Sequence, residues 1–196
     1  METDVFLGVH IDDFSFVLAT LGLILLGLTI LHTIAFIFSK KIRESSTHAK
    51  YSTYLGMAGF AALIATLGAL TYQYGFGLNV CEFCWWQRIF MFPLEIIVAI
   101  SLIFGIKGNH RVLGTLATIG AGFAAYHYTM HVQKWILKAQ EILPASCSAD
   151  PESSCVQTTG VMVFDFLTIP FMALIVFIFV IWMSFLAGRA LKNETK

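Results

Sequence analysis

The apolar residues of this chain are gathered into five long stretches separated by short polar segments. The stretches run approximately Phe14–Phe38, Tyr54–Tyr74, Arg88–Ile106, Val112–Met130 and Val163–Gly188. A helix needs about 20 predominantly apolar residues to cross the hydrocarbon core of a bilayer, which is about 30 Å thick. The pattern therefore predicts an all-α membrane protein with five transmembrane helices.

Composition agrees with this prediction and narrows the class of protein. The chain is 58% hydrophobic and 12% charged, whereas soluble domains are about half apolar and about a quarter charged. The formal net charge is zero, so no overall basicity indicates a nucleic-acid partner. The first apolar stretch follows an acidic leader and is longer than the apolar region of a signal peptide, so we expect it to be retained as a helix.

Lysine and arginine are distributed unevenly among the segments that connect the five stretches. Segments 39–53, 107–111 and 189–196 together hold nine of the 12 basic residues, and the remaining three are Arg88, Lys134 and Lys138. Because cytoplasmic loops carry the excess of positive charge, we predict a multi-pass protein of the cell membrane. Its amino terminus would lie outside and its carboxyl terminus in the cytoplasm.

All four cysteines then fall on the outer side, where disulfides persist. Cys81 and Cys84 form a C-x-x-C pair before the third stretch, and Cys147 and Cys155 lie between the fourth and fifth. The pair at the expected start of the third helix is a reversible two-electron couple. The helix dipole and the nearby Arg88 both favour a thiolate at Cys84. An exposed disulfide that closes a short loop, as Cys147–Cys155 would, is typically labile or catalytic.

The same residues are also compatible with structural roles that involve no redox chemistry. Cys81 and Cys84 could form a structural disulfide, and the four cysteines together could hold zinc, although C-x7-C is wider than the usual ligand spacing. Trp85 stands where haem attachment would need histidine, which excludes a c-type haem. Arg88 needs an anionic or strongly dipolar partner such as a quinone carbonyl, or it extends to lipid headgroups. Glu95 either handles protons or is a protonated packing residue bonded to another helix.

Together the two pairs predict an electron relay. The outer pair would accept electrons from a soluble dithiol protein and pass them, through thiolate attack and a mixed disulfide, to the pair at the membrane edge. That second pair would lie at the bilayer edge because its electron acceptor lies in the bilayer. The prediction is a thiol oxidoreductase that uses no metal.

With these features the chain resembles the DsbB/BdbC family of membrane disulfide-forming oxidoreductases over about residues 54–188. The resemblance lies in CEFCWWQRIFMFPLE, GFAAYHYTMHVQ, FLTIPFMALIVF and the outer cysteine pair. It implies a four-helix transmembrane bundle that holds a quinone (ubiquinone or menaquinone) and reoxidises an extracytoplasmic thioredoxin-fold, DsbA-like oxidase. The chain would then divide into an extra span with its cytoplasmic loop (1–53), the four-helix core (54–188) and a cytoplasmic tail (189–196).

The resemblance also implies roles for individual residues. Cys84 would lie next to the quinone ring, and Cys81 would exchange with the outer pair. Cys147 would be attacked by the soluble partner, which leaves Cys155 to react with Cys81. The residues expected to contact the quinone are Gln87, Arg88, His127 and His131.

Three features depart from the family pattern. The first span precedes the four-helix core, the outer cysteines are only eight residues apart, and His131 stands where many members have glutamine. The extra span is either a peripheral helix, with Gly22 and Gly27 allowing close approach to the bundle, or a recruiter of a partner protein.

Two other functions stay open. A vitamin K epoxide reductase-like protein uses similar parts, but in that family the C-x-x-C follows the loop cysteines, whereas here it precedes them. A non-catalytic membrane protein with a zinc or structural cysteine site is the alternative of a different class.

Overall fold

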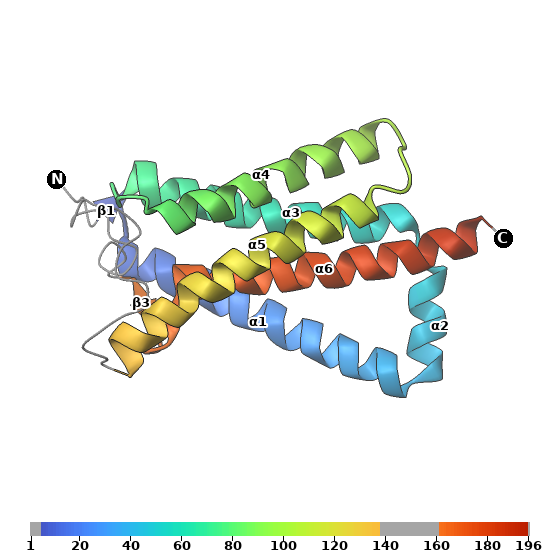
Figure 1. The fold of residues 1–196 in the computed structure, drawn as a ribbon, viewed down its shortest axis with the longest axis horizontal. Helices are drawn as coiled ribbons and strands as arrows, with labels where there is room; N and C mark the ends of the chain where they lie inside the picture. Colours follow the sequence, from blue (N-terminus) through green and yellow to red (C-terminus); the bar gives the residue numbers. More distant parts are fainter. Residues whose placement is uncertain (1–4, 138–160, 196) are drawn as a thin grey trace.

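The computed structural model describes residues 5–137 and 161–195, and most of them are helical (Figure 1). The helices are α1 (Ile11–Phe38), α2 (Lys40–His48), α3 (Tyr51–Leu70), α4 (Glu82–Ile103), α5 (His110–His131) and α6 (Ile169–Glu194). Two π-helical turns, η1 (Thr71–Gly75) and η2 (Val132–Ile136), extend α3 and α5. Two small antiparallel hairpins, β1 (Val5–Phe6) with β2 (Val9–His10) and β3 (Met162–Val163) with β4 (Leu167–Thr168), lie at one end. The all-α architecture predicted from the sequence is confirmed.

Four helices of the described part are long and apolar enough to cross a membrane. They are α1, α3 with η1 (Tyr51–Gly75), α4 and α6. Helix α5 is not among these four, because its glycine, threonine and histidine residues lower its mean hydropathy. At 22 residues it is about 33 Å long, enough to cross. The fifth crossing and the orientation therefore stay predictions.

Helices α3, α4, α5 and α6 form a bundle in which each helix packs against two of the others, in the order α3–α4–α5–α6–α3. Small residues bring the axes together. A Cβ atom added at Gly59 would lie 2.6 Å from Val98, and one added at Gly120 would lie 2.4 Å from the Phe177 ring. Lipid tails are as apolar as leucine, so helices associate in membranes through such close packing.

Helix α1 lies outside this bundle and packs mainly against α6 (Figure 1). Trp182 donates its indole N–H to His32 Nδ1 at 3.1 Å, and Phe36 contacts the same indole edge to face, with ring centroids 5.4 Å apart. Gly22 faces Ile175, 3.8 Å from an ideal Cβ position, whereas Gly27 meets no atom within 4 Å. Only one of the two glycines expected to allow close approach therefore does so.

The structure corrects several predicted boundaries. The segment expected to be a cytoplasmic loop contains α2, whose first turn is capped by Ser39 Oγ, the acceptor of the Ile42 N–H at 3.4 Å. Helix α4 begins at Glu82, six residues earlier than predicted, so the cysteine pair belongs to its first turn. Helix α6 begins only at Ile169. The hairpin β3–β4 precedes it, and Asp165 lies in the hairpin turn with a φ of 61°.

The end of the bundle opposite the hairpins is closed by a polar cluster. Glu194 of α6 accepts hydrogen bonds from the Tyr51 N–H and from Lys107. The Tyr51 hydroxyl oxygen accepts the N–H groups of Gly108 and His110 at 3.1 and 3.2 Å. This cluster joins α3, α6 and the α4–α5 loop. The predicted cytoplasmic segments lie together at this end, away from the two hairpins (Figure 1).

The contact between α5 and α6 gives a prediction for stability. Replacing Gly120 with alanine drives a methyl group into the buried Phe177 ring, so we expect a loss of about 1–3 kcal/mol and a melting temperature several degrees lower. Gly122→Ala, two residues away, meets no atom within 4 Å and should be neutral or slightly stabilising, since alanine is the better helix former. Thermal unfolding of both variants in detergent checks this. Equal melting temperatures would contradict the packing described.

Candidate active site

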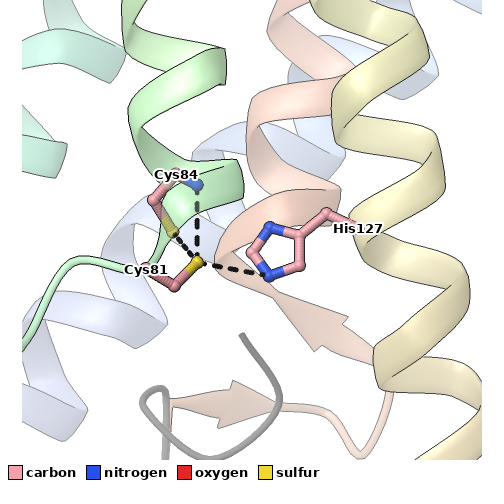
Figure 2. A group of neighbouring side chains, drawn as sticks. All are labelled: Cys81, Cys84 and His127. Atoms are coloured by element: carbon pink, nitrogen blue, oxygen red, sulfur yellow. Dashed lines mark hydrogen bonds between the residues drawn. The ribbon is translucent and has the colours of Figure 1, made fainter. Parts of the chain in front are cut away.

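The first turn of α4 carries the C-x-x-C pair (Figure 2). The first N–H groups of any helix have no partner within the helix and need an acceptor. Here that acceptor is sulfur: Cys81 is the N-cap residue, and its Sγ accepts the Cys84 N–H at 3.4 Å. The two sulfurs lie 3.1 Å apart as free thiols, with Cys81 buried and Cys84 half-buried. They are therefore placed for disulfide exchange.

Helix α5 brings two buried histidines to this pair. His127 Nε2 lies 3.7 Å from Cys81 Sγ (Figure 2) and 3.3 Å from His131 Nε2. On the other side of the ring, Gln87 Nε2 lies 3.0 Å from His127 Nδ1. Because an amide nitrogen donates, Nδ1 accepts, and the proton of a neutral His127 ring then resides on Nε2, facing the Cys81 sulfur. Cys81, Gln87, His127 and His131, four of the predicted site residues, thus meet in one network.

The network favours an ionised sulfur at Cys81. The hydrogen bond from the Cys84 thiol lowers the pKa of the Cys81 thiol most, and the His127 ring and the Cys84 backbone N–H lower it further, against the opposing effect of burial. The thiolate predicted from the sequence at Cys84, where the helix N-terminus would favour it, is therefore not the one that the N-terminal N–H contacts. In the structure the Cys84 N–H points to the Cys81 sulfur, since α4 starts earlier than predicted.

Arg88 lies one turn below Cys84, on the side of α4 that faces α3. It is 8% exposed and donates through Nη1 to Gln73 Oε1 and through Nη2 to the Ala69 carbonyl, the latter at 3.0 Å. The Trp85 ring centroid lies 5.4 Å from its guanidinium carbon. These contacts hold the side chain inward, so it does not extend to lipid headgroups as one alternative required.

The hydrogen bonds of Arg88 go to neutral groups. No carboxylate pairs with it among residues 5–137 and 161–195, where the ion pairs are Lys40–Glu44 and Lys107–Glu194. A buried cation without a counter-ion is costly and marks a site where negative charge arrives or develops.

An elongated cavity of about 420 Å³ adjoins Arg88 and Cys84. Its walls come from α1, α3, α4 and α6 and are almost entirely apolar. The polar side chains gather near one end, where the lining includes Gln73, Asn79 and Gln87 beside Arg88. An apolar space with a few convergent polar groups is typical of a small-molecule site.

The remaining predicted residues have different outcomes. Cys147 and Cys155 lie outside the described residues. Glu95 accepts a hydrogen bond from Thr66 of α3, which provides the neighbouring-helix partner expected for a packing residue. Sequence reasoning missed Gln73, which η1 turns toward Arg88. The available signal was a glutamine at the end of an apolar stretch, on the same side of the membrane as the cysteines.

The site also has the donor set of a metal site. Cys81 Sγ, Cys84 Sγ and His127 Nε2 all lie within 4.8 Å of one another. These are ligand atoms that zinc prefers. The set differs from the four-cysteine site considered from the sequence, because α5 contributes a histidine.

Comparisons with known proteins agree with this site. The profile of the family described as "Disulfide bond formation protein DsbB" matches residues 51–187. "Probable disulfide formation protein C 1" of Bacillus cereus is 36% identical over 139 residues, which cover 68% of this chain and 88% of that protein. "Disulfide bond formation protein C" of Bacillus subtilis is 35% identical over 131 residues, covering 65% and 88%. No solved structure gave a significant match.

The depressed pKa of Cys81 predicts how its reactivity depends on pH. Since a lowered pKa keeps the thiolate populated as pH falls, alkylation of Cys81 in the reduced protein should reach half its maximal rate below about pH 8.5, the ordinary thiol value. His127→Leu removes one cause and should raise that midpoint. Alkylation with a small reagent across pH, quantified for the Cys81 peptide by mass spectrometry, measures both.

The control is His48→Leu in α2, far from the site, which should leave the midpoint unchanged. A midpoint that is the same in wild type and His127→Leu would show that the ring does not act on the Cys81 sulfur.

Proposed function

Since the chain belongs to the DsbB family of disulfide bond formation proteins, we propose that it is a membrane thiol:quinone oxidoreductase. It would take electrons from a soluble thioredoxin-fold, DsbA-like dithiol protein on the extracytoplasmic side and deliver them to a membrane quinone. This reaction would maintain disulfide formation in exported proteins. The observation that carries the proposal is the cysteine pair in the first turn of α4, beside an apolar cavity lined by a buried arginine that has no carboxylate partner among the described residues.

The thiol chemistry requires four thiol–disulfide exchanges. A thiolate of the soluble partner attacks Cys147 of the outer disulfide, and Cys155 leaves as a thiolate. Cys155 then attacks Cys81 of the inner disulfide, which releases Cys84 as a thiolate. The second thiol of the partner resolves its mixed disulfide with Cys147, so the partner leaves oxidised with two electrons fewer. The remaining Cys81–Cys155 bond is exchanged by Cys147, which restores the outer pair and leaves Cys81 and Cys84 reduced.

The protein provides groups that suit the inner pair to this exchange. The N-terminal N–H of α4 and the His127 ring both stabilise negative charge on the Cys81 sulfur, so Cys81 is a good leaving group and is ready to close the disulfide again. Gln87 holds the His127 ring in position through Nδ1. Through the 3.3 Å contact of their Nε2 atoms, His127 and His131 can move a proton away from the sulfurs.

The residues around the cavity fit a quinone. The volume of about 420 Å³ lies within the range of small-molecule sites, the walls are apolar, and the Arg88 guanidinium can meet an oxygen that gains negative charge. Cys84 and Arg88 both line the cavity and so would face the same bound molecule. A quinone bound there supplies the capacity to take up two electrons and two protons, which the inner dithiol gives up as its disulfide forms again.

A non-catalytic zinc site is the second candidate, since the sulfurs of Cys81 and Cys84 and His127 Nε2 already lie within 4.8 Å of one another. In such a protein the dithiol would be held by metal rather than cycled. Metal content distinguishes the two functions.

Quinone reduction by the purified protein tests the proposal directly. With a reduced thioredoxin-fold dithiol protein as donor, ultraviolet absorbance should show turnover for wild type and none above background for Cys84→Ser or Cys147→Ser. The helical content and melting temperature of each serine variant are measured alongside, and Cys84→Ser should keep both, since Cys84 lies outside the main core cluster of the bundle. A folded protein that reduces no quinone and contains one zinc ion per chain would replace the proposal with the zinc site.

Arg88→Gln separates the two halves of the reaction. Loss of a positioned charge that stabilises a developing negative charge costs roughly 100-fold in rate, so quinone-dependent turnover should fall by about that factor. Exchange of the outer pair with the soluble dithiol, followed in a single turnover, should continue at the wild-type rate. Arg111→Gln, an exposed arginine at the start of α5, is the matched control and should behave like wild type in both assays. Equal loss in both half-reactions would show that Arg88 acts on the fold.

A further inference from the structure

Helix α1 lies outside the region that matches the family, yet it forms part of the cavity. The family match covers residues 51–187, whereas Leu18, Leu21, Gly22 and Leu25 of α1 line the same space as Arg88 and Cys84. A bundle of α3 to α6 alone would leave the cavity without this wall. We infer that α1 is the binding wall for the isoprenoid tail of the quinone and selects quinones by their tail. This inference rests on the proposed function.

The shape of the cavity supports a head-and-tail ligand. Its lining residues on α3 extend from Met57 to Gln73, a distance of about 24 Å along the helix, which is far longer than a quinone ring. The end near Gln73 contains the polar groups described above, and the rest of the lining is almost wholly apolar. An amphiphile with a polar ring at Arg88 and a long hydrocarbon tail matches this distribution.

Contacts of α1 fix its height along the cavity. Its Ser15 Oγ accepts the Tyr72 hydroxyl at 2.9 Å, and Leu18 touches Gly68, with its Cδ1 3.0 Å from an ideal Cβ position. Gly22 lies one turn further along, about 6 Å below Leu18, and faces α6. The Arg88 guanidinium bonds to the carbonyl of Ala69, next to Gly68. Gly22 is therefore placed below the head group, beside the first part of a tail.

The cavity also has an exit toward lipid. Four of its lining residues are large, apolar and exposed: Leu21 of α1 (51%) and Met57, Phe60 and Ile64 of α3 (46%, 66% and 37%). The contacts of α1 with α3 and η1 described above lie near the cysteine end, whereas beyond Gly22 His32 of α1 contacts Trp182 of α6 and Ser46 of α2. The two helices thus diverge below the head group, which leaves a lateral path for a tail between them.

Gly22→Leu tests this wall because Gly22 lines the cavity away from its polar end, and an ideal Cβ at this position meets only Ile175 Cδ1, at 3.8 Å. The two probes are a benzoquinone head group with a four-unit isoprenoid tail and the same head group without a tail. Dissociation constants measured by tryptophan fluorescence of the purified, full-length protein should rise about tenfold or more for the tailed quinone only, as expected when a filled cavity is overpacked. Gly27→Leu, on the same helix but outside the cavity and in open space, should change neither constant.

A second substitution tests the same wall in case the Gly22→Leu variant does not fold. Leu21→Trp places a larger side chain at the exposed edge of the cavity, with Ile24→Trp as its control, since Ile24 is similarly exposed but does not line it. Quinone that copurifies with each variant from membranes, extracted and quantified, should fall for Leu21→Trp and not for Ile24→Trp.

The outcomes separate the inference from the function it rests on. If wild type binds neither probe, both the proposed function and the role of α1 are overturned. If wild type binds both probes and the cavity-facing variants weaken them equally or not at all, the proposed function stands and α1 is no tail-binding wall. Selective loss of the tailed probe establishes the inference.

Discussion

The hydrogen bond from the Cys84 N–H to the Cys81 sulfur is the interaction on which the site depends. Because a helix must satisfy its first N–H groups, this contact fixes where α4 begins. Once the start is fixed, Gln87 and Arg88 follow one turn after Cys84, toward α5 and toward α3 respectively. A single terminus thereby joins a reactive sulfur, a histidine network and a buried cation.

The two sides of α4 have different chemistry, and the difference is electrostatic. On the side of α5, an imidazole and an amide form a hydrogen-bonded chain that ends at a sulfur that can ionise. On the side of α3, a guanidinium held by Gln73 and a backbone carbonyl has no carboxylate partner among the described residues. Thiol exchange requires stabilisation of a leaving thiolate. Reduction of a bound acceptor instead requires a positive charge that is already positioned to stabilise the negative charge developing on the acceptor. The cysteine pair lies between these environments.

Helix α1 shows how an added element can change a membrane site without joining its core. It packs on α6 through an aromatic cluster and touches η1 and α3 near the cysteine end. Between these contacts it faces a cavity rather than a close-packed interface. Since lipid and leucine are equally apolar, placing α1 beside the cavity gains little from the hydrophobic effect. The helix contributes by defining the shape of the cavity.

The sequence by itself determined the helical class, the approximate positions of the long helices, the C-x-x-C pair and the family. Each follows from a local pattern: runs of apolar residues, spacing of cysteines, or a contiguous motif. It did not determine that α4 starts at Glu82 or that residues 162–168 form a hairpin, since caps and turns compete within one or two residues and their balance depends on neighbouring elements. Only the tertiary structure decided that Cys81 caps the helix, that Gln73 holds Arg88 and that α1 lines the cavity. These are contacts between residues distant in the chain, and no local periodicity specifies which faces meet.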